Sequence, residues 1–153
     1  FMASAIYHWV EKEPLKTLWR KLDHIGIYVL IAGTYTPVAL ITLEKHSGWF
    51  IFWVVWGITI AGSILKLFFT GRFEILSLLL YLFMGWLIVF DFKTLTANTS
   101  SLGLILMFLG GAFYTLGTLF YSLKKMPYHH VIWHFFVLGG FLSHFFFILF
   151  GVV

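Results

Sequence analysis

The sequence is short of charged side chains. Among its 153 residues, Lys and Arg number 10 and Asp and Glu number 6, while 61% of the residues are hydrophobic. An average soluble domain carries roughly 25% charged residues, whereas this chain carries 10%. So few charges cannot cover the surface of a soluble globule, and such an apolar chain is not disordered. The composition therefore indicates a membrane protein, in agreement with a mean hydropathy of +0.96.

Cysteine is absent, which excludes disulfides, thiolate metal ligands and a cysteine nucleophile. The net charge of +4 comes from Lys and Arg scattered along the chain rather than from a basic stripe. Nucleic acid is therefore excluded as a partner. The sequence contains no long linker, low-complexity tract or stretch with the composition of a soluble domain. We predict a single transmembrane helical domain over residues 1–153.

Five continuous apolar segments predict membrane-spanning helices, because strands would alternate apolar and polar residues. A bilayer core of about 30 Å needs about 20 helical residues, and four of the segments have that length. Ile75–Phe90 is short and would gain length from Glu74 or Asp91 at the interface. We expect the longest loops at Glu11–Leu22 and Asp91–Ser101. The five segments are His24–Leu43, Trp49–Phe69, Ile75–Phe90, Leu102–Leu123 and His130–Val153.

The chain begins with a sixth, shorter apolar stretch, Phe1–Val10. Ten helical residues reach only about 15 Å, half of a bilayer core. The first residue is Phe rather than Met. We therefore expect the chain to be truncated at the N-terminus and to start within a helix.

Lys and Arg are distributed unequally over alternate connections, with eight in one set and two in the other. The excess of cations marks the cytoplasmic side of a membrane protein. The first apolar stretch then runs from outside to inside, and the C-terminus ends outside. The larger set is Lys12, Lys16, Arg20, Lys21, Lys66, Arg72, Lys124 and Lys125, and the smaller set is Lys45 and Lys93.

The positions of the histidines predict a metal site. His130 and His134 are four residues apart, so they share one helix face and can reach a single ion. A histidine pair bound to water and lipid head groups at a helix end is the alternative. The predicted topology brings His8 and Asp23 to the same membrane depth. Three imidazoles with a fourth open position are typical of catalytic zinc, and ionisable groups in membrane segments usually mark function.

Other polar residues are weaker candidates. Ser4 lies one turn from His8 on the same face, where it could hydrogen-bond a water or a substrate carbonyl, or simply pack. His144 lies about 15 Å beyond His134 along the helix, so we expect it to line a cavity or bond within the bundle. His24 faces about 100° away from Asp23. His46 and His129 are expected in loops, and Pro37 is expected to kink its helix.

Several stretches of the sequence resemble the bacterial hemolysin III branch of the progestin and adipoQ receptor (adiponectin receptor-like) family. The resemblance covers essentially the whole chain and is carried by the combination of residues 4–8, 22–28, 31–37, 130–134 and 143–145. It implies a seven-helix bundle with a cytoplasmic N-terminus, of which the first helix is absent from this chain. It also implies zinc ligands at His8, His130 and His134, Asp23 contacting zinc through water, and Ser4 as the site serine.

Three functions follow from these expectations. The related receptors and alkaline ceramidases imply zinc-dependent hydrolysis of a lipid amide, or a related role in membrane lipid homeostasis. Zinc would activate a water, Asp23 would move its proton, and Ser4 would orient water or the oxyanion. The partners would be membrane lipids, including a long-chain lipid amide, and no protein partner is indicated. The alternatives are a non-enzymatic cytolysin or lipid-sensing receptor with structural zinc, and a metal or proton transporter.

Overall fold

A computed structural model describes residues 1–123 and 125–152 of the chain. The described residues form helices and no strand. Five of the helices are long and apolar enough to cross a membrane. The prediction of an all-α integral membrane bundle is therefore confirmed, while two residues used in the predictions, Lys124 and Val153, lie outside the described part of the chain.

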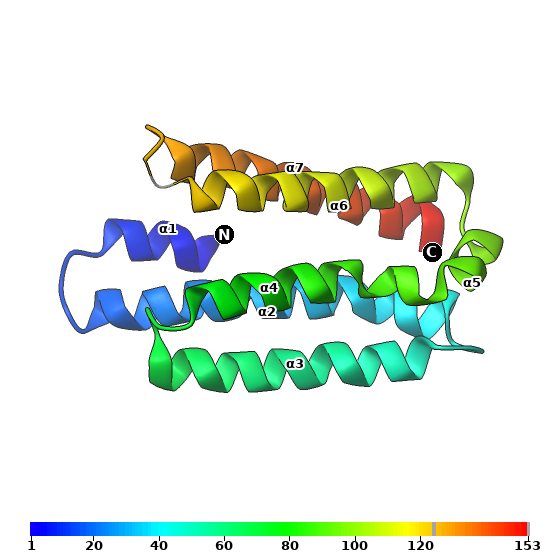
Figure 1. Cartoon of the computed structure of the whole chain (residues 1–153), viewed down its shortest axis with the longest axis horizontal. Coiled ribbons are helices and arrows are strands. Elements are labelled where there is room, and N and C mark those ends of the chain that lie inside the picture. Colours follow the sequence, from blue (N-terminus) through cyan, green and yellow to red (C-terminus); the bar gives the residue numbers. More distant parts are fainter. Residues whose placement is uncertain (124, 153) are drawn as a thin grey trace.

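The long helices lie side by side along one axis (Figure 1). Two short π-helical stretches, η1 and η3, continue α2 and α7, and a short 3₁₀ stretch, η2, joins α4 to α5. The elements are α1 (Met2–Trp9), α2 (Leu15–Pro37), η1 (Val38–Thr42), α3 (Gly48–Phe69), α4 (Glu74–Trp86), η2 (Leu87–Asp91), α5 (Phe92–Asn98), α6 (Ser101–Ser122), α7 (His129–Phe147) and η3 (Ile148–Val152).

The short helix α1 packs along α2 and also reaches α7. Figure 1 shows it in the space between α2 and the α6–α7 pair, at the end of the bundle where α3 passes to α4 and α6 to α7. We call this end the histidine end, because His8 and His130 meet there. Helix α5 lies at the opposite end. The first and last helices of the chain are therefore neighbours.

Both predicted long loops are shorter than expected, because charge marks the end of an apolar run and not the end of a helix. Helix α2 already begins at Leu15, and its first turns are held by Lys21 Nζ, which donates to the Leu67 carbonyl at 2.7 Å. Asp91 caps a further helix, α5, by accepting from the Thr94 amide at 3.4 Å. The third spanning segment thus extends from Glu74 to Asn98 and is not short.

Pro37 ends the α-helical part of α2, and the chain continues as π-helix over Val38–Thr42. Proline has no amide hydrogen and its ring displaces the carbonyl four residues earlier. Two threonines beside it bond to the helix itself: Thr34 Oγ1 donates to the Leu30 carbonyl at 2.9 Å and Thr36 Oγ1 to the Ala32 carbonyl at 2.8 Å. The helix type therefore changes from α to π at Pro37, while the kink expected there stays a prediction.

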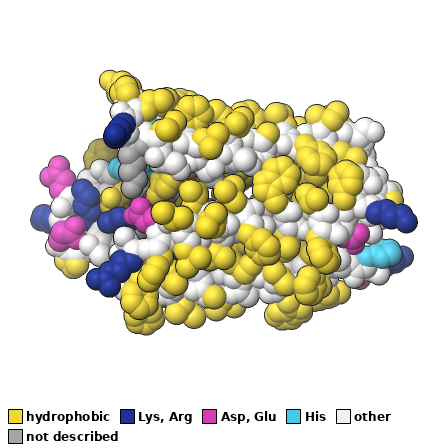
Figure 2. Space-filling view, viewed as in Figure 1, with side chains coloured by type: hydrophobic (Ala, Val, Ile, Leu, Met, Phe, Trp, Pro, Cys, Tyr) yellow, Lys and Arg dark blue, Asp and Glu magenta, His cyan; other side chains and the backbone are white. Residues whose placement is uncertain are grey.

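The buried residues follow one face of each long helix. On α3 they include Ile51, Val55, Thr59, Gly62 and Lys66, spaced three or four apart as on a helix face. The outer surface is apolar, as Figure 2 shows, with Phe68 and Ile75 more than three quarters exposed. Exposed aromatic and aliphatic side chains on this scale suit a lipid environment rather than water.

The contact between α6 and α7 depends on glycines that face aromatic rings. A Cβ added at Gly140 would lie 2.8 Å from Cζ of Tyr114, and one added at Gly110 would overlap the His144 ring. Each helix thus provides a glycine opposite a ring of the other. Small residues let membrane helices approach closely, because packing drives their association.

We predict that Gly140→Ala destabilises the protein. The new methyl group would meet the Tyr114 ring, and overpacking of this kind costs about 1–3 kcal/mol, which a thermal unfolding experiment in detergent would measure. Gly57→Ala is the matched control, because a Cβ at Gly57 has no heavy atom within 4 Å. An equal melting temperature for the two variants would contradict the close α6–α7 packing.

Candidate metal centre

At the histidine end, the last turn of α1 lies beside the first turns of α7. Helix α1 ends at Trp9, because Val10 adopts an extended conformation, so His8 lies in its last turn. Helix α7 begins at His129 after Tyr128, whose φ of 58° turns the chain back. His130 and His134 therefore occupy the first and second turns of α7, on one face.

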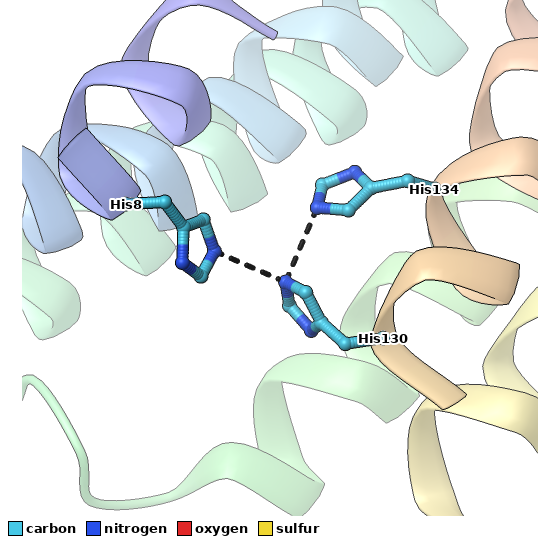
Figure 3. Close-up of side chains that lie close together, drawn as sticks. All are labelled: His8, His130 and His134. Carbon is cyan, nitrogen blue, oxygen red and sulfur yellow. Dashed lines mark hydrogen bonds between the residues drawn. The ribbon is translucent and has the colours of Figure 1, made fainter. Parts of the chain in front are cut away.

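The three imidazoles converge, as Figure 3 shows. The Nε2 atom of His130 lies 3.2 Å from Nε2 of His8 and 3.1 Å from Nε2 of His134. One potential ligand nitrogen from each ring lies within 4.8 Å of the other two. His8 is exposed, while the two α7 histidines are half-buried. We call these three residues the histidine triad.

The chemistry of this donor set fits a metal ion. A neutral imidazole nitrogen is either a donor with one hydrogen or an acceptor with one lone pair. Nε2 of His130 therefore cannot form full hydrogen bonds with both neighbours. A cation that accepts one lone pair from each ring satisfies the three Nε2 atoms at once. Ligands at the usual zinc–nitrogen distance of 2.0–2.1 Å with tetrahedral angles are roughly 3.3 Å apart, close to the two separations measured from Nε2 of His130.

Aromatic side chains hold the imidazoles from the side. The Trp133 ring lies 5.2 Å from the His130 ring and 4.6 Å from the His134 ring, between centroids. The Tyr7 and His8 rings are 4.7 Å apart. Sequence reasoning missed Tyr7 and Trp133, although both lie beside a predicted ligand in the chain. These rings restrict the orientation of the triad.

A cavity of about 570 Å³ opens beside the triad. The predicted site residues Ser4 and Asp23 line it, as does His144 farther along α7. Ser4 is 5% exposed, and its Oγ has no hydrogen-bond partner among the described residues. His144 also contacts the Met107 carbonyl through Nε2 at 3.2 Å. Both roles expected for His144, lining a cavity and bonding within the bundle, are therefore confirmed.

The remaining histidines do not join the triad. Nδ1 of His24 contacts the Arg20 carbonyl at 3.0 Å, and the His24 side chain lines the cavity away from the three converging nitrogens. His46 lies in the turn before α3, as predicted. His129 is the first residue of α7, so its assignment to a loop was wrong.

The structure corrects the assignment of Lys66, which the sequence grouped with the loop cations. Lys66 lies in the last turn of α3 and is fully buried, and it lines the same cavity. Its Nζ atom has no hydrogen-bond partner among the residues described. The only sequence signal was its place inside an apolar segment, three residues before the end of the helix.

Together, the apolar helices, the convergent histidines and the cavity beside them define a polytopic helical membrane protein with a candidate metal centre. The family described as Haemolysin-III related matches residues 1–145, and the chain belongs to this family. This confirms the resemblance found in the sequence.

Curated relatives agree with that assignment. The chain is 45% identical over 153 residues to the "Hemolysin-3 homolog" of Bacillus subtilis (strain 168), across all of this chain and 72% of the relative. It is 42% identical to "Hemolysin-3" of Bacillus cereus, again across all of this chain and 70% of the relative. The human "Monocyte to macrophage differentiation factor" is 29% identical over 156 residues, across 95% of this chain and 63% of that protein. No solved structure matches the chain significantly.

We predict that the purified protein binds about one transition-metal ion per chain. His130→Ala should reduce the metal content to background, because Nε2 of His130 lies between those of His8 and His134. Elemental analysis after dialysis would measure the content. His144→Ala is the control, since His144 contacts Met107 and lies outside the triad. Equal metal content in the two variants would contradict a site at the triad.

Proposed function

We propose that this protein is a zinc-dependent membrane hydrolase that cleaves a lipid amide. The observation that carries the proposal is the convergence of three imidazole nitrogens within 4.8 Å at the wall of a cavity. Three histidine ligands leave one position of a tetrahedral ion open, as in catalytic zinc sites. Bound there, zinc would supply Lewis-acid polarisation and an activated water.

The residues of the chain have distinct roles in this proposal. The Asp23 carboxylate accepts a proton from the attacking water as the oxygen adds to the amide carbonyl carbon. The same proton passes to the leaving nitrogen as the C–N bond breaks, so the products are a carboxylic acid and an amine. Ser4 Oγ, which is buried and has no hydrogen-bond partner within residues 1–123 and 125–152, donates a hydrogen bond to the carbonyl oxygen as negative charge develops there.

The distribution of charge supports a cytoplasmic location for the site. The cations predicted to be cytoplasmic, as far as the structure describes them, lie at the histidine end, on its connections and on the helix turns next to them. Lys45 and Lys93 lie at the opposite end. Under the positive-inside rule the histidine end faces the cytoplasm and the C-terminus lies outside. The cavity would then receive lipids from the inner leaflet of a bacterial plasma membrane.

We predict that Asp23→Asn and Ser4→Ala each retain zinc but lower turnover, by about 10²–10⁴-fold for Asp23→Asn, which removes the proton-transfer group. Release of fatty acid from ceramide and other long-chain amides in nanodiscs would measure turnover, with elemental analysis in parallel. Wild-type protein with full zinc that releases no fatty acid from any amide or ester would contradict the hydrolase proposal.

A second candidate is a non-enzymatic cytolysin or lipid-sensing receptor with structural zinc. The printed name of the Bacillus cereus relative, "Hemolysin-3", favours it. In this case loss of any triad histidine would destabilise the bundle in proportion to the loss of metal. Asp23→Asn and Ser4→Ala would keep full function. The paired measurement of turnover and zinc content thus separates the two candidates.

The orientation is tested by single cysteines, because the natural sequence contains none. We predict that a membrane-impermeant maleimide labels Lys45→Cys in intact spheroplasts and labels Lys12→Cys only after permeabilisation. Both positions are exposed, so access to the reagent is matched. The reverse labelling pattern would contradict the cytoplasmic location of the site.

A further inference from the structure

The side chain of Lys66 has no function in the hydrolysis described above, yet it lines the same cavity as the triad. It is 0% exposed, and its Nζ has no hydrogen-bond partner in the described part of the chain. An ammonium group has three hydrogens to donate and no acceptor. Burial of such a charge without an acceptor is strongly unfavourable, so groups of this kind usually have a partner.

Two charged side chains, Arg20 on α2 and Glu74 on α4, line the same cavity as Lys66. Glu74 accepts from Arg20 at 3.4 Å, and the two side chains are 30% and 40% exposed. An ion pair this long and this exposed contributes little stability and is easily displaced. All three residues line the cavity. An anionic ligand in this cavity can therefore compete with Glu74 for the cations that line it.

We propose that Lys66 binds the anionic head group of an amphiphile whose reacting bond lies at the histidine triad. Ser4 Oγ on α1, next to the triad, and Lys66 Nζ on α3 both belong to the cavity lining and have no hydrogen-bond partner among the described residues. A ligand with an acceptor at each position satisfies both. Carboxylate and phosphate oxygens are the acceptors that match an ammonium.

The rest of the lining indicates what else the ligand carries. Much of the wall consists of aliphatic side chains, including Ile27, Leu30, Ile31, Leu78, Leu82 and Val137. A free inorganic anion would leave these groups facing empty space or water, whereas a hydrocarbon chain would bury them. The substrate class is thus an anionic lipid. This inference deepens the proposed hydrolase and rests on it for the position of the reacting bond.

The test is equilibrium binding to the full chain in phosphatidylcholine nanodiscs, corrected with empty nanodiscs. Four probes are compared: laurate, dodecyl phosphate, dodecanol and inorganic phosphate. We expect both anionic amphiphiles to bind more tightly than dodecanol. Lys66→Gln should weaken their binding about 10- to 100-fold and leave dodecanol unchanged, because a charge-assisted hydrogen bond is lost. Lys66→Arg should retain the selectivity, and Lys12→Gln, which removes an exposed cation, should have no effect.

Three results would overturn the inference. The first is unchanged selectivity in Lys66→Gln, and the second is inorganic phosphate competing as strongly as dodecyl phosphate. The third is unfolding of Lys66→Met, because neutralising an unpartnered ammonium should not lower the melting temperature of the ligand-free protein. The probes need neither metal nor turnover. Selectivity that depends on Lys66 and persists in His134→Ala would therefore stand even if the hydrolase proposal failed.

Discussion

The hydrocarbon region of a bilayer offers no solvent to polar groups, and the arrangement of this protein follows from that constraint. An ionisable side chain is therefore placed near an end of the bundle or facing its interior, where it usually binds a partner or a ligand. With only 16 charged residues in 153, most of the outer surface is apolar. The charged residues of the described chain gather at the two ends, and the triad and its cavity lie at one of them.

The triad joins the two extremes of the chain, because His8 belongs to α1 and its partners to α7. Helix α1 has only eight residues, and it is held by packing along α2 and by ring contacts such as that of Phe1 with Phe141. A shared metal ion would add a further connection between these helices. The same ion would then serve both the stability of the bundle and its chemistry.

Much of this could be predicted from the sequence, for identifiable reasons. Helix geometry alone predicts that His130 and His134 share one face. Counting the spanning segments then places His8 at the same depth in the membrane. The start of α2 and the existence of α5 were not predicted. The charged residues after Leu15 and at Asp91 lower the local hydropathy, but the backbone there stays helical. Trp133 could not be singled out where 22% of residues are aromatic. Burial of Lys66 on α3 depends on how α2 and α4 pack around it, and the sequence near Lys66 does not predict that packing.

The proposed hydrolysis depends on one claim, that a zinc ion lies among His8, His130 and His134. Anomalous diffraction at the zinc absorption edge, from crystals of the purified protein, tests it most directly. We expect a single peak between the three Nε2 atoms, with a non-protein ligand in the fourth position. The absence of a peak, or a fourth protein side chain that closes the site, would contradict the account.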